Sequence, residues 1–142
     1  MFNHEEHEEH EEHEEKAFRD CAEDVVRTVV DSAITVHRHL GPGLLESIYE
    51  QALAFELSQR GVSFLCQVEV PVVYRGHDLG TGFRADMIVE DSLLLELKSV
   101  DAFSAVHLAQ VMTYLRLLRL KRGLLLNFNT RLLKEGIKRV SL

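Results

Sequence analysis

The chain has 142 residues and is 46% hydrophobic, which predicts one folded domain with enough mass for a buried core. No run of about 18 apolar residues is present, and charged residues begin at position 4, so we expect neither a transmembrane helix nor a secretory signal peptide. Cys21 and Cys66 are too few for a disulfide scaffold or a cysteine-rich zinc site, so we expect reduced thiols in a cytoplasmic protein.

The net charge of −7 is unevenly distributed along the chain. Residues 1–16 contain eight glutamates and one lysine, so the rest of the chain is neutral overall. Within that neutral part, residues 116–142 carry +7 and residues 17–115 carry −7. A basic end and an acidic middle suit a protein that holds an anionic polymer at one place and a cation at another. For any single charge, a solvated surface is an equally good explanation.

Residues 1–16 include the period-three segment HEEHEEHEEHEE, which has no apolar residue to bury. We expect a low-complexity tail that is disordered or forms a fraying extension of the next helix, because glutamate favours helix. A tail with no specific role is the favoured interpretation, and weak transition-metal binding by its histidines is the alternative. These histidines are His4, His7, His10 and His13. Residues 17–142 are expected to form a single domain.

Two helices are expected at the start of this domain. Residues 17–40 place apolar side chains at helical spacing, and the Gly-Pro-Gly sequence at 41–43 ends that helix. A second helix is expected over about residues 45–60, with Gly61 as its C-cap.

Strand patterns follow the two helices. Residues 64–76 alternate and are rich in β-branched and aromatic side chains, and Pro71 indicates an edge, a bulge or a break. The order α-α-β-β-β-α-β predicts an α/β fold with a mixed sheet flanked by helices. The remaining expected elements are strands at 79–90 and 93–100, a helix at 103–120, a buried strand at 123–129, and a helical turn or edge strand within 131–142.

The strand LLLELKSV at residues 93–100 carries two charges in an otherwise apolar run. Charged side chains are almost never fully buried unless they are paired or bind something. Because strand side chains alternate between faces, Glu96 and Lys98 share one face of this strand. The strand therefore lies on a surface, or its charges meet a partner inside a cleft.

A three-residue loop at 90–92 would place Asp86 directly opposite Glu96 in a hairpin. Two carboxylates that close repel each other unless a cation lies between them, and Mg²⁺ or Mn²⁺ prefers such oxygens. Lys98 lies on the same face and suits positioning of an attacking water and stabilisation of charge on a phosphate. The alternative is an ordinary surface strand in which Arg84 or Lys98 pairs with a carboxylate, and a slip of one residue in register would undo the pairing.

This constellation resembles the PD-(D/E)xK nuclease superfamily. Asp86, Glu96 and Lys98 follow one another across a hairpin that lies between a leading helix and a following helix. One departure is Ala85, which precedes the aspartate where the superfamily's name has proline, a position that varies among its members.

The heptad GLLESIY at 43–49 matches the GxxExxY signature of a small bacterial family assigned to that superfamily. The resemblance covers about residues 24–142, including LLNF at 125–128, and leaves out the HEE segment. It implies a restriction-endonuclease-like fold in which a mixed β-sheet core is flanked by helices.

The resemblance also implies roles for individual residues. Asp86 and Glu96 would be catalytic metal ligands, Lys98 the catalytic lysine, and Mg²⁺ or Mn²⁺ the cofactor. Glu46 resembles a helical glutamate that many superfamily members add to the metal site, and its alternative role is to complement the helix dipole. Tyr49 lies one turn further along the same helix face, where it would touch substrate or simply pack.

The following helix carries Gln110 and Tyr114, which resemble the QxxxY motif of RecB-like exonucleases. His107 shares their helix face, and such a group would bind phosphate or a metal-bound water. The alternative is a helix face that points to solvent. Gln67 and Arg84 are further polar strand residues expected to line the cleft.

The expected function is metal-dependent hydrolysis of phosphodiester bonds in nucleic acid, with DNA favoured as substrate and the basic C-terminal stretch in contact with the backbone. No separate recognition module is evident, so high sequence specificity is not expected. A homodimer is expected by analogy with small nucleases of this fold. The alternative function is a non-catalytic nucleic-acid-binding or protein-assembly module that retains the fold.

Overall fold

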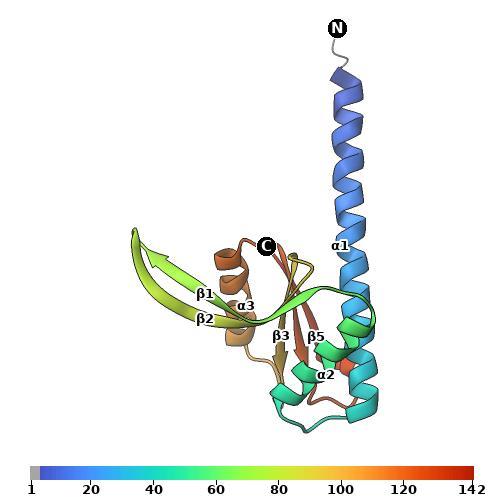
Figure 1. Cartoon of the computed structure of the whole chain (residues 1–142), viewed down its shortest axis with the longest axis vertical. Helices are drawn as coiled ribbons and strands as arrows, with labels where there is room; N and C mark the ends of the chain where they lie inside the picture. The colour runs from blue at the N-terminus through green and yellow to red at the C-terminus, as the bar shows by residue number, and fades with distance from the viewer. Residues whose placement is uncertain (1–3) are drawn as a thin grey trace.

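The computed structural model describes residues 4–142, with the side chains of residues 4–11 and 14–21 outside the described part. The elements are α1 (His4–Leu40), α2 (Glu46–Gln59), β1 (Phe64–Tyr74), β2 (His77–Val89), β3 (Leu93–Lys98), α3 (Ala105–Leu118), β4 (Arg122–Asn127), the 3₁₀ helix η1 (Leu133–Gly136) and β5 (Ile137–Ser141). The strands form one five-stranded sheet in the order β1-β2-β3-β4-β5. Helices α1 and α2 pack on one face of this sheet and α3 packs on the other (Figure 1).

The mixed α/β architecture expected from the sequence is confirmed. Strands β3 and β4 pair in parallel across the α3 crossover, and the other neighbouring strands pair antiparallel. Both alternatives left open for the C-terminal segment occur, since η1 is followed by the edge strand β5.

Helix α1 begins at His4, so its backbone includes the whole HEE segment. The side chains of His4, His7 and His10 lie outside the described residues, and metal binding by this segment stays the alternative to a tail with no specific role. None of the helices in the described part of the chain is long and apolar enough to cross a membrane.

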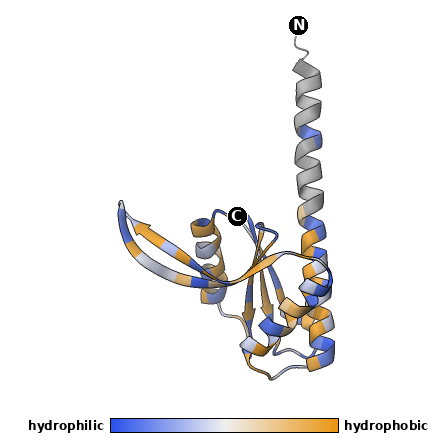
Figure 2. Cartoon of the chain, in the orientation of Figure 1, coloured by the Kyte–Doolittle hydropathy of each residue, from blue (hydrophilic) through white to orange (hydrophobic). Residues whose placement is uncertain are grey.

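The larger hydrophobic core lies between the sheet and helices α1 and α2. Figure 2 shows hydrophobic residues concentrated in the central strands and alternating with hydrophilic ones along the lower part of α1. Strand β3 is buried from Leu93 to Leu97 because helices cover both of its faces, which explains its nearly continuous apolar run. The core includes Val26, Val29, Ala33 and Val36 of α1, Tyr49, Leu53 and Leu57 of α2, and Leu95, Leu97, Leu124 and Leu126 of the sheet.

A second, smaller core lies under α3 on the opposite face. Val111 and Leu115 of α3 are fully buried against Leu94 and Leu125 of the central strands. Tyr114 extends this core toward β2, where its ring stacks on Phe83 with a centroid separation of 3.7 Å. Strands β2 and β3 therefore lie between two apolar layers. This packing fixes the backbone that carries their polar side chains.

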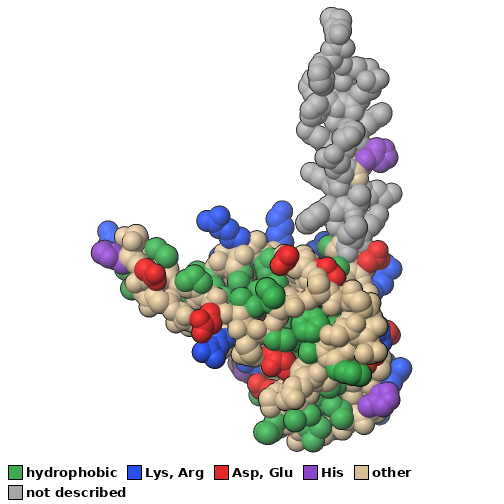
Figure 3. All heavy atoms as spheres, viewed as in Figure 1, with side chains coloured by type: hydrophobic (Ala, Val, Ile, Leu, Met, Phe, Trp, Pro, Cys, Tyr) green, Lys and Arg blue, Asp and Glu red, His purple; other side chains and the backbone are tan. Residues whose placement is uncertain are grey.

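Strands β1 and β2 continue beyond the body as a two-stranded ribbon (Figure 1). The predicted irregularity at Pro71 is confirmed, because the β1–β2 register shifts on both sides of this residue. Gly82 lies close against Val72, where an added Cβ would meet the valine Cγ2 at 2.2 Å. Hydrophobic side chains remain exposed along this ribbon (Figure 3), among them Tyr74 and Leu79.

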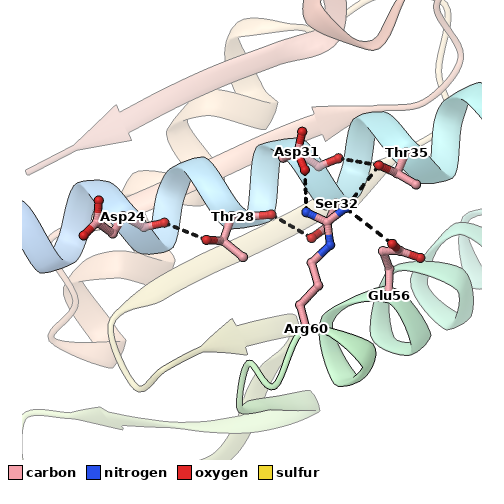
Figure 4. A network of polar contacts seen from close by, with 7 residues as sticks. All are labelled: Asp24, Thr28, Asp31, Ser32, Thr35, Glu56 and Arg60. Atoms are coloured by element: carbon pink, nitrogen blue, oxygen red, sulfur yellow. Dashed lines mark hydrogen bonds and ion pairs between the residues drawn. The ribbon is translucent and has the colours of Figure 1, made fainter.

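A polar network connects α1 to the end of α2 (Figure 4). The guanidinium of Arg60 donates hydrogen bonds to the carboxylate of Asp31 and to Thr35 Oγ1 in α1, and to Glu56 Oε1 in α2. Asp31 is largely exposed and Arg60 is partly so, which limits the contribution of each pair to stability. The network fixes the angle between two helices that share the larger core.

We expect Arg60→Met to lower the free energy of unfolding by about 0.5–1 kcal/mol, because methionine keeps the aliphatic contact and loses the ion pairs. Urea denaturation at low and high salt measures this change, and the loss should shrink at high salt because exposed pairs are screened. Arg131→Met is the matched control, since Arg131 is exposed and its ion pair with Glu135, four residues along the chain, joins no separate elements. A loss that is independent of salt would contradict an electrostatic role.

Candidate active site

The candidate site lies on the β2–β3 hairpin, near the C-terminal end of β3 and away from the hairpin loop. Met87, Ile88 and Val89 pair with Leu95, Leu94 and Leu93, across the three-residue loop at 90–92. This is the register predicted from the sequence. Continuing it by one residue brings Asp86 opposite Glu96, at the position where the regular ladder ends.

At this position the side chains of Asp86 and Glu96, and not backbone carbonyls, accept hydrogen bonds from backbone N–H groups of the opposite strand. The backbone N–H of Asp86 donates to Glu96 Oε1 at 3.3 Å, and the backbone N–H of Leu97 donates to Asp86 Oδ2 at 2.9 Å. Each carboxylate is thus held by the opposite strand. The hairpin thereby fixes the two acidic side chains next to each other.

Burial and proximity perturb the protonation of this pair. Glu96 is only 5% exposed. Its burial and then the nearby Asp86 carboxylate raise the pKa of Glu96 to about 8, and Lys98 acts in the opposite direction. The pKa of Tyr114 on α3 is raised by burial and then by Glu96 and Asp86, so its hydroxyl lies within electrostatic range of the pair. The pair therefore carries an excess of negative charge that a proton or a cation relieves.

The donor chemistry of the pair fits a hard divalent cation. Carboxylate oxygens are the ligands that Mg²⁺ and Mn²⁺ prefer, and Mg²⁺ is usually bound through one or two protein carboxylates. The raised pKa of Glu96 is the response expected of a buried carboxylate beside a second carboxylate. Within the described residues, no group of three or more His, Cys, Asp or Glu side chains is arranged to hold a metal ion. The described residues therefore provide two carboxylate ligands for a cation and not a complete set of protein ligands.

Helix α2 places the predicted residues Glu46 and Tyr49 in different roles. Glu46 is exposed, and its Oε1 accepts a hydrogen bond from the backbone N–H of Ser99 at 3.2 Å, so it lies beside the segment that follows Lys98. The structure does not gather Glu46 with Asp86 and Glu96 into one metal-ligating group.

The predicted substrate contact of Tyr49 is corrected. Its side chain is fully buried and its ring stacks on Phe128 at 4.4 Å. Its hydroxyl donates to the Gly41 carbonyl at 2.6 Å and accepts from the Leu44 N–H at 3.1 Å. Tyr49 therefore packs in the core and closes the loop between α1 and α2, which is the alternative that the sequence left open.

Sequence reasoning missed Glu50, one turn beyond Glu46 on the same helix. Its Oε1 accepts a hydrogen bond from the Gln67 carboxamide at 2.8 Å, and the same Gln67 nitrogen lies 3.5 Å from Asp86 Oδ1. The pKa of the neighbouring Cys66 thiol is raised by burial and then by Glu50 and Asp86. The i, i+4 spacing from Glu46 was the available signal, because residues at this spacing share a helix face.

The structure gives the predicted residues on α3 and β2 different surroundings. The carboxylate pair contributes to the raised pKa of Tyr114, whereas Gln110 is exposed one turn earlier. His107 forms a capping box with Ser104, in which its Nδ1 accepts the Ser104 N–H at 3.1 Å. Arg84 is exposed and donates to Glu69 Oε1 at 3.2 Å, so it pairs across the ribbon with a carboxylate outside the site.

An open hollow of about 980 Å³ lies beside the end of β3. Exposed apolar side chains gather at this lower end of the body, at the α1–α2 connection (Figure 3). The segment that follows Lys98 is fixed by Asn127, whose Oδ1 accepts the Val100 N–H and whose Nδ2 donates to the Val100 carbonyl. The hollow is lined by Gly43, Leu44, Leu45, Glu46, Ser47, Ile48, Ser99 and Asn129.

Two of the basic C-terminal residues lie at the other end of the sheet. Arg122 and Arg139 both donate to the carboxylate of Glu23 in α1, at 2.7 and 3.3 Å. Arg122 pairs with the first residue of β3, whereas Lys98 is its last residue. Neither arginine therefore belongs to the carboxylate site, and both are engaged in holding α1 to the sheet.

The family model of the PD-(D/E)XK nuclease superfamily matches residues 23–140. The chain therefore belongs to this superfamily. No curated protein and no solved structure matches it.

We expect the free energy of unfolding to fall as the pH rises from about 4.5 to about 8, because folded Glu96 keeps its proton in this window while unfolded Glu96 has lost it. The contribution is at most about 1.4 kcal/mol per pH unit. Urea denaturation of the metal-free protein between pH 5 and pH 8 measures it, and Glu96→Gln should flatten the slope relative to wild type. The exposed Glu135→Gln serves as the control and should keep the wild-type slope. Equal slopes in wild type and Glu96→Gln would contradict the raised pKa.

Proposed function

We propose that the chain is a divalent-cation-dependent phosphodiesterase that cleaves nucleic acid, with DNA as its substrate. The observation that carries this proposal is the Asp86–Glu96 pair at the end of the β2–β3 hairpin, with Lys98 on the next position of the same face. Membership of the PD-(D/E)XK nuclease superfamily supports the same reaction class.

In this proposal Asp86 and Glu96 hold Mg²⁺ or Mn²⁺ and Lys98 acts on the scissile phosphate. A bound divalent cation supplies Lewis-acid polarisation of a phosphoryl oxygen and lowers the pKa of water. The ammonium of Lys98 stabilises negative charge that develops on the phosphoryl oxygens and orients the attacking water. The backbone N–H of Leu97 holds Asp86 in place, so the site needs little reorganisation when the substrate arrives.

Substrate contacts are proposed for the polar side chains beside the pair. The proposed contacts to a phosphate or its bound water are Tyr114, whose pKa both carboxylates raise, and Gln110, which is exposed on the same helix face. Arg84 and His107 are less direct candidates for substrate contact. Arg84 would have to break its ion pair with Glu69. The Nδ1 atom of His107 is already engaged in the helix cap. These are contacts to the backbone, so cleavage with little sequence preference is proposed.

The assignment to the GxxExxY family within the superfamily is also part of the proposal. The heptad at 43–49 supports it, and the structure gives two of its residues structural partners, with Glu46 on Ser99 and Tyr49 on Gly41. A homodimer that presents two such sites to opposite strands stays a prediction.

We expect the wild type to cut labelled DNA in Mg²⁺ or Mn²⁺ and to be inactive in EDTA. Asp86→Asn should abolish cutting because it removes a ligand charge, and Lys98→Met should reduce the rate by about 100-fold or more, as for the loss of one transition-state donor. Linear, circular and branched DNA, with an RNA of matched sequence, show which substrate is cut and whether free ends are needed.

Two matched controls accompany these variants. Asp91→Asn removes an exposed carboxylate from the loop of the same hairpin, and Arg27→Met removes an exposed cation from α1, outside the basic C-terminal stretch; both should keep wild-type activity. Cutting that survives in Asp86→Asn and Lys98→Met would refute this site. Absence of cutting on every substrate, with nucleic acid still bound, would favour the non-catalytic binding module.

A further inference from the structure

Strand β1 is distorted at one residue that lies opposite Asp86. Cys66 pairs with Met87 and Val68 pairs with Ala85, so the register places Gln67 across from Asp86. Gln67 itself has a backbone φ of 51°, in the left-handed region that non-glycine residues seldom adopt. Such a conformation is strained and persists only when the surroundings impose it.

The Gln67 side chain joins two carboxylates from different elements. Its Nε2 donates to Glu50 Oε1 on α2 at 2.8 Å and lies 3.5 Å from Asp86 Oδ1 on β2. A carboxamide nitrogen has two hydrogens, so it can serve both oxygens at once. Without this donor the two carboxylates would face each other and repel. The other oxygen of Asp86 is fixed by the Leu97 N–H, so Asp86 is held from both sides.

We infer that Gln67 is a positioning residue that orients Asp86 for cation binding, and that Glu50 of α2 anchors Gln67 in that position. Glu50, rather than Glu46, is then the α2 carboxylate that acts on the site, through Gln67 and not as a third ligand. Glu46 has its own partner in the Ser99 N–H, beyond the end of β3. This inference rests on the proposed function, because it concerns the cation that Asp86 and Glu96 would hold.

The effect of Gln67 is to prepare the site before the cation arrives. One carboxamide nitrogen, anchored by Glu50, lies against Asp86 Oδ1, so the Asp86 carboxylate is already oriented in the metal-free chain. Partners that orient metal ligands in this way typically contribute about 10–100-fold to metal affinity. Removal of the carboxamide should therefore weaken cation binding without changing the fold.

The test measures Mn²⁺ binding to the full chain by titration calorimetry and by electron paramagnetic resonance of free Mn²⁺. We expect Gln67→Gly and Glu50→Gln each to weaken binding by about 10-fold or more, while Glu46→Gln stays within about threefold of wild type. Glycine accepts a positive φ without strain, so Gln67→Gly removes the side chain while relieving the backbone. Thermal unfolding of each metal-free variant shows that any loss of affinity is not a loss of folding.

Each outcome decides the inference. Wild-type affinity in both Gln67→Gly and Glu50→Gln, or a larger loss in Glu46→Gln than in Glu50→Gln, would overturn it. Absence of Mn²⁺ binding by the wild type would overturn it as well. If the wild type binds Mn²⁺ with the expected variant pattern but cuts no nucleic acid, the inference stands and the proposed function fails.

Discussion

The candidate site depends on the forced proximity of two carboxylates in a mostly buried corner. Asp86 and Glu96 lie opposite each other because the β2–β3 register leaves no other arrangement, and each is held by a backbone N–H of the opposite strand. Burial and mutual repulsion raise the pKa of Glu96 to about 8. A carboxylate whose pKa is raised by burial and by a second carboxylate is a recurrent feature of functional sites.

The surrounding structure holds this corner from several directions. The two apolar layers on either face of the sheet fix β3, and the stacked pair of Phe83 and Tyr114 covers the α3 side. Asn127 holds the chain just beyond Lys98 through two hydrogen bonds to Val100. Gln67 joins the site to α2 through Glu50. Helix α1 stabilises the fold, and not the carboxylates directly, through the larger hydrophobic core and through its hydrogen bonds with Arg60.

Much of the fold could be predicted from the sequence because local patterns determine it. The alternation in β1, the continuous apolar run of β3 and the helical spacing in α2 and α3 each reflect which faces are buried. The hairpin register was also predictable, since a three-residue loop fixes it. The last strand was ambiguous because a five-residue edge strand carries too few residues for a clear period.

The details of the site were less predictable because they depend on contacts between distant segments. Whether Tyr49 faces substrate or core is decided by its stacking on Phe128 and its bond to Gly41, and neither follows from helical spacing. Gln67 joins α2 to β2 from a residue at which β1 has a positive φ, and a regular strand pattern does not predict such a residue. The pairing of Arg122 with Glu23 joins segments far apart in the sequence, so a count of basic residues does not predict it.

The most direct test of the cation site is the anomalous diffraction of crystals soaked in Mn²⁺. A peak within coordination distance of both Asp86 and Glu96, about 2.0–2.3 Å from their oxygens, is the expected result. Its absence from an Asp86→Asn crystal grown under the same conditions would show that the pair holds the ion. A wild-type crystal with Mn²⁺ bound elsewhere and none between these carboxylates would contradict the role assigned to them.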